Sequence, residues 1–269
     1  MEGAIVRATP GSGYGGRDAA GKAAVSGPRP AGRHRPRVAV ARVAGRLELQ
    51  VDGVAYSVFD SDGPWSGYVW DALAASVLLH PEPAPRVLML GCAGGTVLAL
   101  VRRLRPRARL TAVELEPGMI AVARERFGLD DHGAEVIEAD GVAWVDRTRR
   151  RFDVIVDDMY AAGRRGLQRP VGDEEDWLAR VASRLAPGGI AVTNATTDDD
   201  PPGLAVAVRD AHRAVFADVV SLEPRLGMNV VFAGRGEPFD LPAFDEAAAP
   251  LPDVDVAAVR DLLVRREPR

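Results

Sequence analysis

Between Arg86 and Thr196, short apolar segments alternate with amphipathic ones, and this alternation constrains the fold more than any other feature. The apolar segments have the length and composition of buried strands, whereas those between them carry apolar residues at helical spacing. Strands that alternate with helices predict a parallel sheet covered on both faces, with an α/β, doubly wound architecture. The loops after the strand ends should then line one edge of the sheet, where ligands bind in such folds. The strand-like segments are RVLMLG, RLTAVEL, AEVIEAD, RFDVIVDD and IAVTNAT, and the helix-like segments are GTVLALVRRLRP, PGMIAVARERFG and DEEDWLARVASRLAPGG.

The regions that flank this alternation differ in composition. Residues 1–35 are rich in Gly, Ala, Pro and Arg without apolar periodicity, so we predict a disordered tail. Residues 36–64 alternate apolar and polar side chains around AGR and DG, which predicts a small N-terminal β-region with tight turns. Residues 65–235 form the main α/β domain, which begins with the helix-like SGYVWDALAASVLLH and ends in an antiparallel strand pair. The proline-rich, acidic residues 236–269 are predicted as a C-terminal extension.

Charge and composition narrow the classes of function. The formal net charge of −4 gives no overall attraction to nucleic acid or to anionic membranes, so neither is an expected partner. The single cysteine, Cys92, rules out a disulfide framework, and the histidines lack metal-ligand spacing, so we expect no metal site. No apolar run approaches the ~20 residues of a membrane span. We therefore expect a cytoplasmic protein, in which the exposed edge of the small β-region would allow a homodimer.

A glycine turn follows the first buried strand in LMLGCAGGTVLAL, Leu88 to Leu100. Its backbone N–H groups lie at a helix N-terminus, which suits an anion or a polar ligand end. The dinucleotide fingerprint G-x-G-x-x-G fails at Ala93 and Thr96, which argues against NAD. A looser G-x-G-x-G spacing, typical of S-adenosylmethionine enzymes, fits Gly91 and Gly95 but not Ala93. A tight turn that holds no ligand stays open as an alternative.

Two acidic residues follow at later strand ends. Glu114 lies about twenty residues after the turn, where a carboxylate can accept both hydroxyls of a ribose. Asp140, in EADG, ends another strand and can accept from an adenine amino group. Taken alone, Glu114 is also compatible with a solvated carboxylate, and Asp140 with a turn-forming Asp-Gly pair. Because these signals occur in order and each at a strand end, together they predict a nucleoside cleft.

The same segments resemble the class I S-adenosylmethionine-dependent methyltransferase superfamily, and within it the spermidine synthase-like branch. RVLMLGCAGGTVLALVRRL, LTAVELEPGMIAVARERFGL, VIEADGVAWV, RFDVIVDDMY and LAPGGIAVTN carry the likeness, and LELQVDGVAYSVFDSD resembles the branch's N-terminal β-domain. The resemblance runs from about Arg46 to Ala233. It implies a Rossmann-like methyltransferase sheet, mostly parallel with an antiparallel last strand, in residues 65–235. It also implies S-adenosylmethionine, or alternatively its decarboxylated form, bound by Gly91, Ala93, Gly94, Gly95, Glu114, Leu115, Asp140, Gly141 and Asp157.

Departures from the branch affect which reaction is expected. Aminopropyltransferases carry G-G-G-D-G-G, whose Asp faces the amine of decarboxylated S-adenosylmethionine, and here Gly94 stands at that place. Intact S-adenosylmethionine brings its own carboxylate, which we expect the bare amides of Gly91 to Gly95 to receive. The family's D-S-S-D motif aligns with DMYA, so Asp158 keeps the first carboxylate and Ala161 has lost the second. Its tyrosine-histidine-glutamate cluster aligns with Val69, Trp70 and Asp71, where only an acid remains.

These departures favour methyl transfer to a small-molecule amine or hydroxyl over aminopropyl transfer. Asp158 is the candidate catalytic residue that takes the acceptor's proton, although Asp157 is an alternative because neighbouring strand residues point to opposite faces. The predicted acceptor pocket consists of Tyr68, Trp70, Asp71 and Tyr160. Packing between the small β-region and the sheet is the alternative role for these aromatic rings. Polyamine aminopropyl transfer and a non-catalytic nucleoside-binding or interaction module stay open as rival functions.

Overall fold

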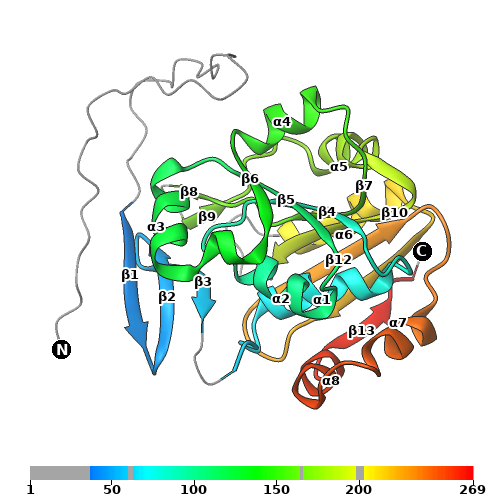
Figure 1. Cartoon of the computed structure of the whole chain (residues 1–269). Helices are drawn as coiled ribbons and strands as arrows, with labels where there is room; N and C mark the ends of the chain where they lie inside the picture. The colour runs from blue at the N-terminus through cyan, green and yellow to red at the C-terminus, as the bar shows by residue number, and fades with distance from the viewer. Residues whose placement is uncertain (1–36, 60–62, 164–165, 198–202, 269) are drawn as a thin grey trace.

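The structure, a computed structural model, describes residues 37–59, 63–163, 166–197 and 203–268. The predicted tail of residues 1–35 lies outside these described residues. Within them, an eight-stranded sheet forms the body of the protein and a separate three-stranded sheet lies beside it (Figure 1). No helix in the described segments has the length and apolar character needed to cross a membrane.

The eight-stranded sheet has the order β13-β11-β12-β10-β7-β4-β5-β6. Neighbouring strands from β6 to β10 pair in parallel, whereas β12 and β13 run opposite to the other strands. The predicted doubly wound α/β class, mostly parallel and with an antiparallel end, is therefore confirmed. The strands are β4 (Arg86–Leu90), β5 (Arg109–Glu114), β6 (Ala134–Glu138), β7 (Phe152–Asp157), β10 (Leu185–Thr196), β11 (Asp218–Glu223), β12 (Asn229–Arg235) and β13 (Leu263–Arg266).

Two apolar layers cover the sheet because its central strands are apolar on both sides. In β4, Val87 and Met89 belong to one core cluster and Leu88 and Leu90 to another. The first layer includes α1 (Val69–Ala75), the 3₁₀ turn η1 (Ser76–Leu79), α2 (Thr96–Leu104), α7 (Leu241–Ala248) and α8 (Asp253–Arg260). The second includes α4 (Gly141–Arg147), α5 (Glu174–Ala182) and α6 (Leu204–Val215). At the β6 side lie α3 (Pro117–Phe127) and the 3₁₀ turn η2 (Leu129–His132).

Several elements differ from the sequence-based expectation. The predicted helix of residues 66–80 is shorter, because α1 tightens into η1 before His80 and Pro81. The pattern analysis did not predict α4, α6 or the small hairpin of β8 (Ala161–Gly163) and β9 (Gly166–Gln168). The segment LAVAVRDAHRAV of α6 does carry apolar residues at helical spacing, and it follows a left-handed Gly203 that begins the helix.

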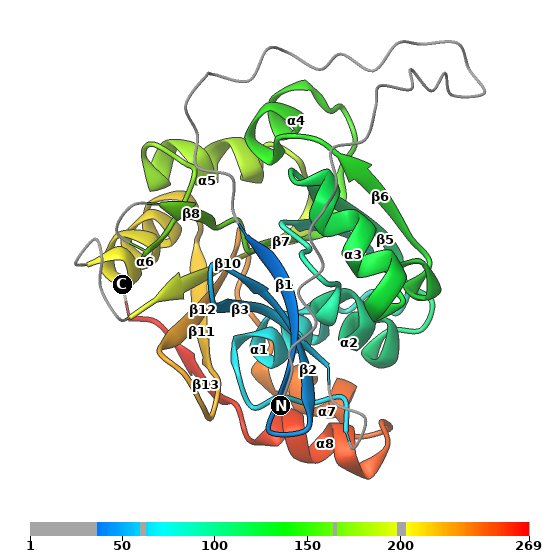
Figure 2. The ribbon, with the colours of Figure 1, turned by 90° about the vertical axis from the view of Figure 1, so that its left-hand side faces the viewer.

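The predicted C-terminal extension is part of the main sheet. It forms α7, α8 and β13 (Figure 1), and β13 pairs with β11 (Figure 2). Asp255 of α8 is fully buried and accepts hydrogen bonds from Trp65 Nε1, at 2.8 Å, and from Arg103 Nε of α2. These two bonds fasten the C-terminal helices to the layer formed by α1 and α2.

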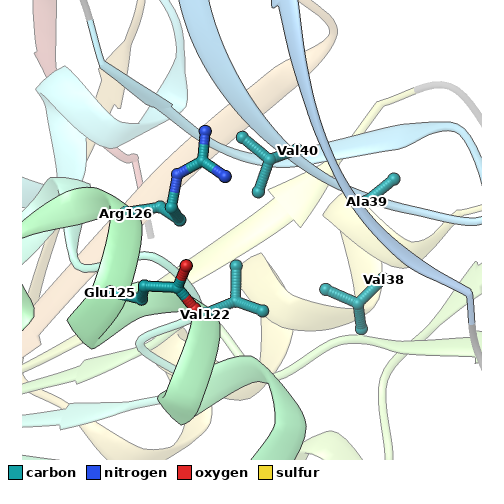
Figure 3. A pocket seen from close by; sticks show the side chains of 6 residues that line it. All are labelled: Val38, Ala39, Val40, Val122, Glu125 and Arg126. Atoms are coloured by element: carbon teal, nitrogen blue, oxygen red, sulfur yellow. The ribbon is translucent and has the colours of Figure 1, made fainter. Parts of the chain in front are cut away.

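The small sheet consists of β1 (Val38–Val43), β2 (Arg46–Val51) and β3 (Val54–Phe59), all antiparallel. Both connections are two-residue turns with positive φ at each position, as in type I′ hairpins, and they fall at the predicted AG and DG dipeptides. The sheet lies across the edge where the main strands end (Figure 2). A small groove between β1 and α3 marks one contact of the two units, and it is lined by Val38, Ala39, Val40, Val122, Glu125 and Arg126 (Figure 3).

We predict that Asp255→Ala lowers the free energy of unfolding by about 2–4 kcal/mol, because it leaves the partly buried Trp65 N–H and the Arg103 guanidinium without their acceptor. Urea denaturation followed by circular dichroism measures this change. Asp261→Ala, at the exposed end of the same helix, is the matched control and should change stability by less than about 0.5 kcal/mol. Equal effects of both substitutions would show that the Asp255 bonds do not hold the C-terminal helices.

Candidate functional site

The site begins where β4 and β7 end side by side. The Asp158 N–H donates to the Leu90 carbonyl at 2.9 Å, which brings the segment after β7 against the glycine turn. Gly91 has φ +77°, and a Cβ built there would lie 2.7 Å from the Asp158 carbonyl oxygen. Glycine is therefore required at position 91 both by its backbone conformation and by this close approach.

Glu114, at the end of β5, holds the glycine turn with its side chain. Its carboxylate accepts the N–H groups of Cys92 and Ala93 at 3.2 and 3.0 Å, and those of Leu115 and Glu116 at 2.9 and 3.1 Å. Four donors occupy the usual acceptor positions of a carboxylate. Burial raises the pKa of Glu114, while these N–H bonds oppose the shift. The residue thus lies beside the turn as its place in the sequence predicts, and it is already bonded to the backbone.

The amide groups of the turn are engaged within the protein. Besides the two bonds to Glu114, Gly91 donates to the Val113 carbonyl at 2.9 Å and Gly95 donates to the Cys92 carbonyl at 2.8 Å. Gly94 donates to Ser57 Oγ of β3, also at 2.8 Å. The expectation that bare amides of Gly91 to Gly95 receive a carboxylate is therefore wrong for this conformation, because each of these N–H groups has an internal acceptor.

Ser57 also fills the space that a side chain at position 94 would need. A Cβ built on Gly94 would lie 2.7 Å from Ser57 Cβ and 2.9 Å from Ser57 Oγ. Contacts under 3.0 Å are essentially never seen for a real Cβ, so an aspartate at position 94 requires β3 to move. The small sheet thus packs directly on the turn. The residue before Ser57, Tyr56, has a hydroxyl that is shielded from solvent and has no hydrogen-bond partner within the described part of the chain.

The two aspartates at the end of β7, Asp157 in the strand and Asp158 directly after it, have different partners. Asp157 is nearly fully buried and accepts from Arg169 Nη2 and Trp177 Nε1, both at 2.7 Å, and from the Met159 N–H at 3.2 Å. Asp158 is partly buried and accepts from Asn194 Nδ2 of β10 at 2.7 Å. Burial raises the pKa of Asp158 to about 7, against the lowering effect of the Asn194 bond. Of the two residues, only Asp158 has a carboxylate oxygen that no described donor contacts.

Arg169 fixes the chain that follows Asp158. Its buried guanidinium pairs with Asp157 and, through Nε at 2.8 Å, with Glu174 of α5. It also lies over the ring of Tyr160, 5.9 Å from the ring centre. The Tyr160 hydroxyl donates to the Asn194 carbonyl at 3.0 Å. Tyr160 is therefore held beside Asn194 and Asp158, with its hydroxyl already used.

The remaining residues predicted for the acceptor pocket lie in different surroundings. Tyr68 is 39% exposed, with its ring 6.3 Å from that of Trp70. It lies against Gly227, in the turn before β12, and Asn229 of that strand bonds to Asn194 at 3.0 Å. Tyr68 is thereby linked to the surroundings of Asp158.

Trp70 and Asp71, in contrast, are buried in α1. The carboxylate of Asp71 accepts from the Ser66 N–H and hydroxyl at 3.1 and 2.9 Å, and from the Gly67 N–H. Burial raises the pKa of this carboxyl group. Asp71 therefore holds the turn that begins α1.

The nucleoside half of the predicted site lies at the ends of β5 and β6. Leu115 is 39% exposed directly after Glu114. Asp140 caps α4 by accepting the Ala143 N–H at 3.0 Å through Oδ1, and its Oδ2 accepts no hydrogen bond from a described residue. Gly141 lies against Met159, which leaves no room for a side chain there. An apolar surface next to an exposed carboxylate oxygen suits a flat heterocycle that carries an amino group.

Sequence reasoning missed four polar residues at this edge: Tyr56, Ser57, Asn194 and Asn229. Asn194 lies within the predicted strand segment IAVTNAT, where a polar residue in a buried strand is an available signal. Tyr56 and Ser57 come from the small β-region, whose position over the turn depends on packing between distant segments. Among the described residues, no group of His, Cys, Asp and Glu is arranged to hold a metal ion.

Comparison with known proteins agrees with this geometry. Residues 87–189 match a family model described as a methyltransferase domain. Over 173 residues the chain is 30% identical to a polyamine aminopropyltransferase of Chromobacterium violaceum, with 62% of this chain and 64% of that protein covered. Two further aminopropyltransferases, of Neisseria meningitidis, are covered over 44% of their length. The chain thus matches about half to two thirds of the length of these curated relatives.

Solved structures show the same fold. A probable spermidine synthase from Corynebacterium glutamicum has a TM-score of 0.63 at 18% identity, with 83% of this chain and 88% of that chain covered. Human methyltransferase-like protein 13, solved in complex with SAH, has a TM-score of 0.57 at 24% identity, with 74% and 93% covered. The fold is that of the class I S-adenosylmethionine-dependent methyltransferases. Together with the sequence matches, these likenesses support a methyltransferase fold that is similar to the spermidine synthase-like branch of that superfamily.

We predict that Gly94→Ala destabilises the protein by about 1–3 kcal/mol, because the new Cβ collides with Ser57. In the background of Ser57→Gly, which removes the colliding carbon, the same substitution should cost less. Ser57→Ala keeps that carbon and is the matched control that gives no rescue. A double-mutant cycle from urea denaturation measures the coupling, and additive effects in both backgrounds would contradict the contact.

Proposed function

We propose that this protein is a transferase that uses S-adenosylmethionine and moves its methyl group to a small-molecule amine or hydroxyl. The observation that carries the preference for methyl transfer is the contact between Ser57 and Gly94, since it leaves no room for an aspartate side chain at position 94. A buried cationic amine without such a partner is costly. The decarboxylated donor, whose chain ends in a free amine, is therefore the less suitable ligand.

Three features of the edge support a donor of this kind. Gly91 and Gly94 allow a tight turn against Asp158 and Ser57, which a side chain at either position would disrupt. Leu115 and the Asp140 oxygen that accepts no hydrogen bond from a described residue suit an adenine ring. Glu114, directly before Leu115, connects this surface to the glycine turn. Tyr56, which packs on the cluster that contains Ala93 of the turn, has a buried hydroxyl without a hydrogen-bond partner among the described residues. We propose that Leu115, Asp140 and Gly141 contact the nucleoside, and that Glu114 shapes this part of the site through its bonds to the glycine turn. Asp157, bonded to Arg169 and Trp177, supports the neighbouring end of β7.

When bound, S-adenosylmethionine supplies a methyl group that its positively charged sulfur has already activated. The task of the protein is then to hold the acceptor in line with that group and to take its proton. Asp158 is the base in this proposal, because it has an open oxygen and a pKa of about 7, close to neutral pH. Tyr68 and Tyr160 would line the acceptor side, while Trp70 and Asp71 support the start of α1 from the core.

Aminopropyl transfer from decarboxylated S-adenosylmethionine is the second candidate. The names of several relatives favour it, including the aminopropyltransferase of Chromobacterium violaceum. Asp158, which aligns with the first carboxylate of the family's D-S-S-D motif, is compatible with it as well. The two reactions differ in the part of the donor that the protein must recognise, so binding measurements separate them.

Calorimetric titration of the full chain with S-adenosylmethionine, its decarboxylated form and NAD tests the proposal. We expect tightest binding of the intact sulfonium donor and none of NAD, because the turn lacks the dinucleotide fingerprint. Preferred binding of the decarboxylated donor would support aminopropyl transfer instead. If the protein binds none of the three, a non-catalytic role gains support and the proposal is wrong.

We predict that Asp158→Asn lowers kcat by about 10²–10⁴-fold with little change in donor affinity, because an amide cannot take the acceptor's proton. In the wild-type protein, kcat should fall as the pH drops below about 7, since the carboxyl group is then protonated and no longer a base. Initial rates between pH 5.5 and 9 measure both effects. A flat pH profile, or full activity of Asp158→Asn, would exclude this role.

Asn194→Ala is the matched variant for the pH dependence. In the wild-type protein, Asn194 Nδ2 donates to Asp158 Oδ1 and lowers the pKa of that carboxyl group. Removal of this bond should therefore move the midpoint of the kcat–pH profile to higher pH. A loss of activity without any shift of the midpoint would mean that Asn194 contributes only to packing.

A further inference from the structure

We infer that the Tyr56 hydroxyl, from the small N-terminal sheet, binds the carboxylate at the amino-acid end of the methyl donor. The inference rests on the proposed function and deepens it, because it names the group that distinguishes intact S-adenosylmethionine from its decarboxylated form. Tyr56 lies outside the segments in which the glycine turn and the acidic strand ends occur.

A β-bulge directs Tyr56 toward the site. Leu49 of β2 pairs with Ser57 and Gln50 pairs with Ala55, so Tyr56 is an extra residue without a partner across the strand. Successive residues of a regular strand point to opposite faces, but a bulge re-aims one of them. Ser57 contacts Gly94, and the Tyr56 ring packs on the cluster that contains Ala93 and Met119. Both neighbours therefore face the turn and the helix behind it.

The Tyr56 hydroxyl is a hydrogen-bond donor that the described part of the protein does not use. Its oxygen is shielded from solvent and forms no hydrogen bond with any residue that the structure describes. Burial of a polar group without a partner is unfavourable and calls for an explanation. The amides of Gly91 to Gly95, the usual donors at such a turn, are all taken. Tyr56 is thus an unused donor at the turn, next to Ser57, whose Oγ accepts from Gly94 and donates to no described residue.

Burial and nearby carboxylates keep the Tyr56 hydroxyl protonated. Burial raises the pKa of Tyr56, and the carboxylates of Asp52, Glu114 and Asp158 add to that shift. Glu114 ends β5 and Asp158 follows β7, and these strands lie on either side of β4. The hydroxyl therefore keeps its proton and can donate a hydrogen bond to a ligand.

The test is a Tyr56→Phe variant of the full chain, titrated calorimetrically with three ligands: S-adenosylmethionine, its decarboxylated form and 5′-methylthioadenosine. Loss of a hydrogen bond to a charged group should weaken binding of S-adenosylmethionine about tenfold or more. The other two ligands lack the carboxylate, so their affinities should stay within about twofold of wild type. Unchanged binding of S-adenosylmethionine, or equal weakening of all three ligands or of the decarboxylated form, overturns the inference.

Ser221→Ala is the matched control, because Ser221 of β11 carries another buried hydroxyl without a partner, in mid-strand rather than at the edge. It should leave all three affinities unchanged. Neither variant should lower the melting temperature, since neither loses a hydrogen bond in the free protein. A lower melting temperature of Tyr56→Phe together with weaker binding would assign the hydroxyl a structural role and overturn the inference. If the wild-type protein binds none of the three ligands, the proposed function itself fails, and the inference fails with it.

Discussion

The carboxylate of Glu114 is the interaction on which the rest of the site depends. It joins the end of β5 to the turn after β4 by accepting two N–H groups from each segment. A buried carboxylate needs such donors, and a tight turn with buried amides needs such an acceptor, so each makes the other possible. The consequence is a rigid turn whose backbone N–H groups all donate to acceptors within the protein. Any ligand that sits over this turn must find its hydrogen bonds elsewhere.

That constraint gives the small N-terminal sheet a role beyond covering the edge. Ser57 accepts a hydrogen bond from the Gly94 N–H, and it also occupies the space that a side chain at position 94 would need. In related aminopropyltransferases, as the resemblance implies, that side chain is an aspartate on the turn itself. Here a polar group approaches from β3 instead. The exchange replaces a negative charge by a neutral hydroxyl, and it is the reason to expect a donor that carries its own carboxylate.

The sequence supports prediction of what depends on local pattern. The parallel strands, the glycine turn and the acidic strand ends follow from apolar periodicity and from turn chemistry. What the pattern cannot supply is the partner of each polar group. Asp157 and Asp158 are neighbours in the chain, yet their hydrogen-bond partners differ. Asp157 accepts from Arg169 and Trp177, whereas Asp158 accepts from Asn194. All three partners lie more than ten residues away in the sequence. The orientation of Tyr56 depends on one extra residue in β3, which a strict two-residue alternation does not reveal.

The bond between Trp65 and Asp255 joins residues 190 positions apart in the chain. Closing so long a loop costs more conformational entropy than any contact between sequence neighbours, and contacts of this kind slow folding. The strands from β4 to β10 can assemble through short crossovers, whereas the layer of α1 and α2 is completed only when α8 arrives. Folding of this protein should therefore proceed from a central sheet that forms early to a late docking step, and the order of events runs from the middle of the chain to its two ends.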